Sequence, residues 1–209
     1  MKYWIVSAVL LLAAAGLALS GINEYVFFAG YVVLTFVVLA TAWNILGGYA
    51  GYVNFGTPAF FGLGAYSAAV LFKALGAPLL LQIAAGAAMG GLLGFGVGLL
   101  TLRLMGANPV RIKQWAFGIA TGVSALAGAM LIIVGPVEPA LDRLYIGRTF
   151  CVVVLAGLGS MTGTLAAGLI LGISESIVLM MLGASWAPAV AFGLLLIVLG
   201  IRPQGLFGR

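Results

Sequence analysis

The chain contains 209 residues, of which 64% are hydrophobic, and it carries nine Lys or Arg residues against four Asp or Glu residues. A charged side chain at the bilayer centre costs about 2.5–3.5 kcal/mol, and roughly 20 apolar residues cross the hydrocarbon core. The long charge-free blocks of this chain therefore predict an all-α integral membrane protein. These blocks are residues 3–23, 25–72, 74–102, 114–137, 149–174 and 176–201. The sequence has no His and no lysine followed by Ser or Thr, which excludes a Ser–His dyad, most zinc sites and a P-loop, so no enzyme activity, metal or cofactor is expected and any ATP must bind another chain.

The first predicted element is a helix over residues 4–20. Lys2, the apolar run and Ala18-Leu19-Ser20 also resemble a secretory signal with a small-residue cleavage site. A single positive charge and an apolar stretch that is long for a signal favour an uncleaved helix. Residues 26–46 are then predicted to cross back after a short turn that carries Glu24.

Glycine interrupts the chain after this second span, between Gly47 and Pro58. Non-helical backbone at membrane depth is tolerated only where it is buried in protein or lines a wet cavity. A transport pathway is one interpretation, and a loop at the membrane surface before an ordinary helix is the other. Under the first, Asn44, Asn54 and Thr57 could bind a zwitterionic solute, aided by the positive end of a half-helix that starts near Pro58.

Two further spans are predicted at about residues 56–72 and 79–102. In the second of them glycine recurs every four residues, which creates a small-residue face that lets another backbone approach closely. We interpret this face, and its shorter repeats later in the chain, as packing seams; the glycines are Gly86, Gly90, Gly94 and Gly98, then Gly118 and Gly122, then Gly168 and Gly172.

A basic loop at residues 103–113 follows these spans. Because Lys and Arg accumulate on cytoplasmic loops, this loop and the tail at residues 202–209 are both predicted inside the cell. A turn followed by the start of a short helix would give a partner protein a rigid surface to bind. Alternatively, the basic residues of this loop only fix the orientation of the neighbouring helices in the membrane. The candidate contact residues are Gly106, Asn108, Pro109, Arg111 and Lys113.

The second half of the chain must finish inside after an odd number of crossings from an outer loop. Residues 114–135 are predicted to cross outward to this loop, residues 136–148, which has no positive excess. The glycine-rich segment Gly157–Gly163 is then expected to break the chain, because each interior glycine costs a helix about 1 kcal/mol relative to Ala. We expect a half-helix and two full helices, at residues 149–157, 164–182 and 186–201.

Three residues of this half attract attention. Cys151 is expected to serve packing, since a lone cysteine forms no intrachain disulfide. Glu175 is the acid within an apolar block, so it is either a functional group or a carboxylate held near the interface by its serine neighbours. With no buried Arg or Lys expected, a solute that passes should be neutral or zwitterionic. Ser160 completes the path candidates, which are Asn44, Asn54, Thr57, Ser160 and Glu175.

A family resemblance begins at Trp43, where the chain reads W-N-I-L-G-G-Y-A-G-Y-V-N-F-G and then F-F-G-L-G-A-Y from Phe60. It resembles the N-x-x-x-G-Y-A-G-x-x-x-x-G and F-x-G-x-G-A-Y stretch of the branched-chain amino-acid (LIV-type) ABC transporter permeases. Three further pieces are similar, in order, to the family's coupling loop, its G-L-G-S-x-x-G turn and its R-P-Q-G-L-F-G tail; they are Met105–Pro109, Gly157–Gly163 and Arg202–Gly208.

The resemblance implies a type II ABC importer permease in the bacterial inner membrane, with about seven to eight helical segments, some short or broken. It implies transport of branched-chain amino acids or a related small polar solute. The partners implied are a second permease subunit, cytoplasmic ATPase subunits docked on the basic loop, an external solute-binding protein and membrane lipid, and no nucleic acid is expected. We treat residues 1–209 as one transmembrane permease domain, with N-terminal helices over 3–102, the coupling loop over 103–113, C-terminal helices over 114–201 and the tail over 202–209.

Two departures from the family pattern keep other readings open. The chain passes almost directly from Arg103 into the coupling loop, where full-length relatives carry several more membrane segments, and Ala107 stands where the family usually has an acid. A shortened, non-transporting membrane scaffold is therefore one alternative. An aquaporin-like channel is another, suggested by Asn108-Pro109-Val110-Arg111, although such a channel needs two Asn-Pro-Ala half-helices and one such element is present.

Overall fold

The computed structural model describes residues 24–49, 55–104, 111–138 and 141–207. Within these ranges every regular element is a helix, and six helices have the length and hydropathy to cross a membrane. The predicted all-α membrane fold is confirmed for this part of the chain. The predicted helix over residues 4–20 and the site candidates Asn54, Gly106, Asn108 and Pro109 lie outside the described residues.

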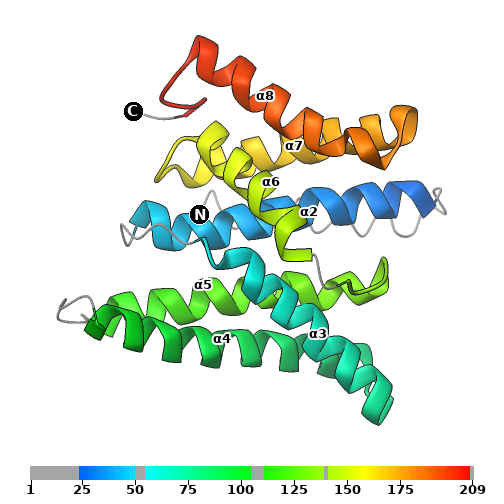
Figure 1. Cartoon of the computed structure of the whole chain (residues 1–209), viewed down its shortest axis with the longest axis vertical. Coiled ribbons are helices and arrows are strands. Elements are labelled where there is room, and N and C mark those ends of the chain that lie inside the picture. Colours follow the sequence, from blue (N-terminus) through cyan, green and yellow to red (C-terminus); the bar gives the residue numbers. More distant parts are fainter. Residues whose placement is uncertain (1–23, 50–54, 105–110, 139–140, 208–209) are drawn as a thin grey trace, which may run out of the picture.

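The helices follow the predicted order (Figure 1). In the first half they are α2 (Glu24–Asn44), continued by the π-helical turn η1 (Ile45–Tyr49), then α3 (Thr57–Leu75) and α4 (Leu79–Leu104). In the second half they are α5 (Arg111–Ala129) with the 3₁₀ turn η2 (Met130–Ile133), α6 (Leu141–Ala156), α7 (Met161–Leu182), the 3₁₀ turn η3 (Ala184–Trp186) and α8 (Ala187–Ile201).

Helix α2 lies in the middle of the bundle, between α3–α5 on one side and α6–α8 on the other (Figure 1). Buried residues of α2 belong to both hydrophobic cores. Phe36, Ala40 and Trp43 pack with α6, α7 and α8, whereas Leu39 packs with Phe61 of α3 and with α5. Cys151 is buried in the first core, which confirms its predicted packing role.

The small-residue faces are packing seams, as predicted. Along α4, Cβ atoms placed on Gly86, Gly90 and Gly94 would each meet a side chain of α5 at less than 3 Å. The other pair of helices repeats the arrangement, because Cβ atoms on Gly168 and Gly172 of α7 would collide with valines of α2. Glycine therefore sets the distance between neighbouring helices, as it does in other membrane bundles.

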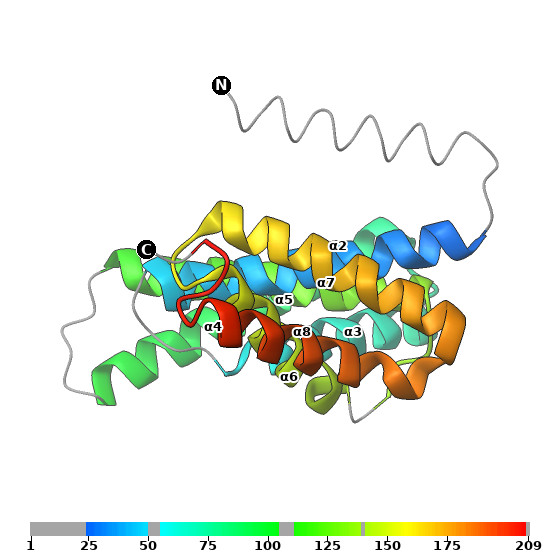
Figure 2. The same ribbon diagram turned by 90° about the horizontal axis from the view of Figure 1, so that it is seen from above.

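The elements gather their ends at two opposite sides of the bundle (Figures 1 and 2). The end of α4, the start of α5, turn η1, the α6–α7 turn and the tail after α8 lie at one end. The start of α2 and the α7–α8 turn lie at the other. We call these the tail end and the η3 end. The basic residues that begin α5 thus share an end with the tail, in agreement with the predicted placement of both on one side of the membrane.

The predicted outer loop over residues 136–148 is wrong in its second half. Helix α6 begins at Leu141 and continues without a break to Ala156, so it replaces the expected half-helix over residues 149–157. The charges of this segment had indicated a loop. A helix forms because residues 141–156 contain no proline and a single glycine, Gly147, and because one of the charges, Arg148, finds a partner inside the bundle.

Candidate functional site

The side chain of Asn44 joins the two glycine-rich interruptions at the tail end. Asn44 is fully buried in the last turn of α2. Its Nδ2 donates a hydrogen bond to Thr164 Oγ1 at 2.8 Å, and the Gly159 backbone N–H donates to its Oδ1 at 3.1 Å. Thr164 Oγ1 in turn donates to the Ser160 carbonyl at 2.8 Å. One amide therefore fixes the end of α2 to the turn that begins α7.

Backbones approach closely at the same place. The π-helical turn η1 follows Asn44 directly, and a Cβ added to Gly48 would lie 2.8 Å from Gly159 Cα. Single π-helical turns inside α-helices occur frequently at functional sites. Within the described residues, the two glycine-rich interruptions therefore contact each other.

The tail after α8 also contacts this junction, and the sequence analysis did not predict this contact. The backbone N–H groups of Leu206 and Phe207 donate to the carbonyls of Leu155 and Ala156 at 2.8 and 3.2 Å. These carbonyls belong to the last turn of α6, where helix geometry leaves them without an intrahelical partner. Gly205 turns the chain with a φ of 85°, a conformation that favours glycine.

Two other path candidates begin helices. Thr57 is fully buried at the first position of α3, next to Pro58. Ser160 caps α7, because its Oγ accepts a hydrogen bond from the Gly163 backbone N–H at 3.1 Å, and its side chain is partly exposed. Their hydroxyls thus lie at helix N-termini, which carry the positive end of the helix dipole.

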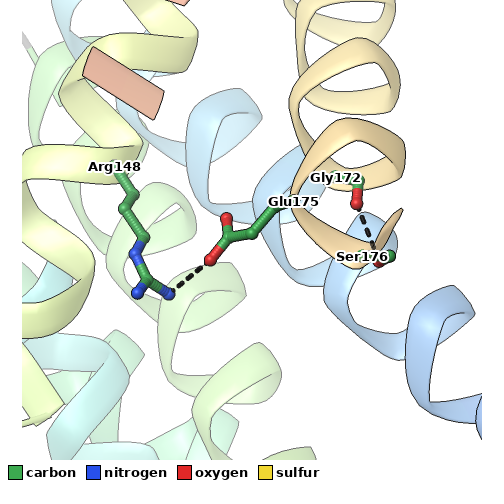
Figure 3. A network of polar contacts seen from close by, with 4 residues as sticks. All are labelled: Arg148, Gly172, Glu175 and Ser176. Atoms are coloured by element: carbon green, nitrogen blue, oxygen red, sulfur yellow. Dashed lines mark hydrogen bonds and ion pairs between the residues drawn. The ribbon is translucent and has the colours of Figure 1, made fainter. Parts of the chain in front are cut away.

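Glu175 forms an ion pair with Arg148. Figure 3 shows the two side chains pointing toward each other from α7 and α6, with Arg148 Nη1 2.7 Å from Glu175 Oε1. Glu175 is 1% exposed and Arg148 is 17% exposed. The sequence did not predict an arginine inside the bundle, and Arg148 is partly buried there. The serine neighbours do not hold the acid, since Ser176 Oγ donates to the Gly172 carbonyl at 2.8 Å instead.

A cavity of about 160 Å³ opens beside this ion pair. It lies toward the η3 end, because it is bounded by the first half of α2, the last turns of α7 and the start of α8. Aromatic rings and aliphatic side chains form the rest of its wall. The lining residues are Phe28, Val32, Phe36, Tyr145, Arg148, Glu175, Leu179, Ala184 and Ala187.

The residues that line the cavity come from helices whose contact the sequence did not predict. Tyr145 lies one turn before Arg148 on α6, and its ring packs against Phe36 of α2 at a centroid distance of 6.2 Å. Neither Tyr145 nor Arg148 was a sequence candidate. An arginine within an apolar wall could have been suspected only once residues 141–156 were known to be one helix.

Arg111 and Lys113 begin helix α5 at the tail end. The structure therefore separates the sequence candidates into two groups. Asn44, Thr57 and Ser160 lie at helix ends, with Asn44 and Ser160 in one junction, whereas Glu175 lies with Arg148 in the cavity toward the opposite end. Among the described residues, no group of three or more acidic or cysteine side chains gathers that could hold a metal ion.

Comparisons with known proteins match most of the described chain. The family described as "Branched-chain amino acid transport system / permease component" matches residues 25–110 and 102–199. The permease protein BraD of the high-affinity branched-chain amino acid transport system of Pseudomonas aeruginosa is 36% identical over 107 residues, and LivH of Escherichia coli K12 is 35% identical over the same length. Each match covers 51% of this chain and 35% of the relative. No solved structure gives a significant match.

Proposed function

The chain belongs to the family of branched-chain amino acid transport permeases, and from this membership we propose that it is a permease subunit of an ABC importer in the bacterial inner membrane. Its solute is a branched-chain amino acid or a related small polar solute. The observation that carries the proposal is the family match, which spans both halves of the bundle from α2 to α8.

The ATPase subunits dock at the tail end. Arg111 and Lys113 begin α5 there, beside the tail, and both carry charges that positive-inside topology assigns to the cytoplasm. With the tail end inside, the cavity at the η3 end faces outward, where an external solute-binding protein delivers the solute. A second permease subunit completes the assembly, and all of residues 1–209 form one permease domain.

A non-transporting scaffold is the second candidate. It is favoured by the direct passage from α4 into the basic segment before α5, where full-length relatives carry more membrane segments. The family match argues against an aquaporin-like channel, because it places the chain among permeases.

Co-purification with ABC-transporter ATPase subunits of the same host tests the proposed docking. We expect the tagged chain to retain them in detergent, and we expect Arg111→Glu/Lys113→Glu to lose them without unfolding the membrane part. Gly106→Val should act in the same way. Lys73→Glu is the matched control, because Lys73 is an exposed cation in the last turn of α3. Equal ATPase recovery from the charge-reversed and control variants would refute docking at this loop.

A further inference from the structure

The ion pair of the partly buried Arg148 and the buried Glu175 is incompletely satisfied. Arg148 Nε and Glu175 Oε2 are both buried, and neither finds a hydrogen-bond partner among the described residues. The pair therefore keeps one spare donor and one spare acceptor after forming its contact at 2.7 Å. Buried polar groups are almost always paired, and an exception requires an explanation.

Arg148 and Glu175 line a cavity that suits a small solute. Its volume of about 160 Å³ is close to that of an engineered protein cavity of roughly 150 Å³ that binds benzene. Phe28, Phe36 and Leu179 supply apolar parts of its wall. A ligand that fits this surface needs an anionic group for Arg148, a cationic group for Glu175 and a compact apolar part.

We propose that this cavity binds a zwitterionic amino acid with a small apolar side chain, with its carboxylate on Arg148 and its ammonium on Glu175. The inference rests on the proposed function and assigns the solute site within it. Arg suits a carboxylate because its guanidinium can donate two parallel hydrogen bonds. A zwitterion adds no net charge to the interior, so the cavity stays electrically balanced with and without the ligand.

The ion pair alone is expected to add little to the free energy of unfolding. Replacing a buried ion pair by apolar residues of similar volume is often neutral or stabilising, because desolvation offsets the attraction. The double variant Arg148→Met/Glu175→Met therefore removes both charges while keeping the volume and the fold. This variant separates a binding role from a structural one, which single substitutions cannot do.

Equilibrium binding to the full chain in nanodiscs tests the proposal, with labelled L-alanine, L-valine and L-leucine as probes. We expect saturable binding to the wild type and a loss of at least about thirtyfold in Arg148→Met/Glu175→Met, the scale of truncating one partner of a buried charge pair. The exposed residues Glu138 and Arg143 provide the control Glu138→Gln/Arg143→Gln, which should bind like the wild type. Leucinamide and 4-methylpentanoate, which each lack one charge, should not compete.

The outcomes distinguish this site from the proposed function. No saturable binding of any probe, or equal binding by the double variant, would overturn the site. ATP-driven uptake that persists in a complex carrying the double variant would overturn the site and leave the transport function standing. The zwitterionic headgroup of phosphatidylethanolamine has the same paired charges, so binding is repeated with this lipid in the nanodisc. Unchanged affinity supports a solute site, whereas its loss would assign the pair to a headgroup.

Discussion

Asn44 and Gly159 are joined by a hydrogen bond of 3.1 Å between the asparagine Oδ1 and the glycine N–H, although 115 residues separate them in the chain. The same amide donates to Thr164. The contact thus connects the end of α2 to the start of α7 and holds the two glycine-rich segments together. Because it lies at the tail end, a movement imposed at this end would reach both halves of the bundle through this junction.

Replacing Asn44 by alanine should destabilise the protein by about 1–3 kcal/mol, because it removes the buried amide and with it the hydrogen bonds to Thr164 Oγ1 and to the Gly159 N–H. The free energy change is measured by thermal unfolding in detergent. Ser67→Ala is the control, since Ser67 Oγ bonds the Leu63 carbonyl within its own helix. An Asn44→Ala variant as stable as the control would show that the junction contributes nothing to the fold.

The close approach of α5 to α3 predicts a second effect. A Cβ on Gly128 of α5 would overlap the Phe61 carbonyl oxygen of α3. Gly128→Ala should therefore push the helices apart and cost about 1–3 kcal/mol, the usual range for overpacking. Gly96→Ala, on the open face of α4, meets nothing within 4 Å and should raise helix stability by up to about 1 kcal/mol. Similar unfolding temperatures for the two variants would contradict the close approach.

The ion pair predicts an order of stabilities. Glu175→Gln leaves Arg148 in the bundle interior without its anion, at a cost of about 3–5 kcal/mol. Arg148→Met/Glu175→Met should lie much closer to the wild type. The exposed Glu138→Gln should change nothing measurable. Thermal unfolding in one detergent ranks the variants, and a double variant less stable than Glu175→Gln would show that the pair is a net source of stability.

Much of the fold could be predicted because lipid imposes simple constraints. Charges marked the ends of most spans, and glycine marked both the packing seams and the break before α7. The outer loop was assigned wrongly because Asp142 and Arg143 look like loop residues, while the partner that draws Arg148 into the bundle lies 27 residues away on α7. A charged residue in the sequence marks the end of a membrane-spanning helix only when its side chain faces water.

The site was predicted in part for the same reason. Asn44 and Glu175 stood out as polar groups in apolar surroundings. Arg148 did not, because it lies at the edge of a charge-free block. Thr164 and Tyr145 carried no signal, since a threonine or tyrosine is common in membrane helices, and their importance comes from contacts between distant segments. Such contacts require the three-dimensional structure.

The orientation proposed for the bundle is tested by cysteine labelling in a Cys151→Ala background. Glu138→Cys and Gln204→Cys place single thiols on exposed positions. Glu138 follows α5 and η2, which run away from the tail end, whereas Gln204 belongs to the tail after α8 (Figure 1). A membrane-impermeant maleimide should label Glu138→Cys in intact spheroplasts and Gln204→Cys only after permeabilisation. The reverse pattern would invert the topology and place the basic start of α5 outside.

ATP-driven uptake in proteoliposomes tests the central claim, transport by this chain, most directly. The chain is reconstituted with its ATPases, a second permease subunit and the external binding protein, and labelled L-leucine is supplied on the binding-protein side. The account predicts accumulation that requires ATP on the opposite side and disappears when the P-loop lysine of the ATPase is replaced. A complete complex that hydrolyses ATP yet accumulates none of L-leucine, L-valine and L-alanine would contradict it and favour the non-transporting scaffold.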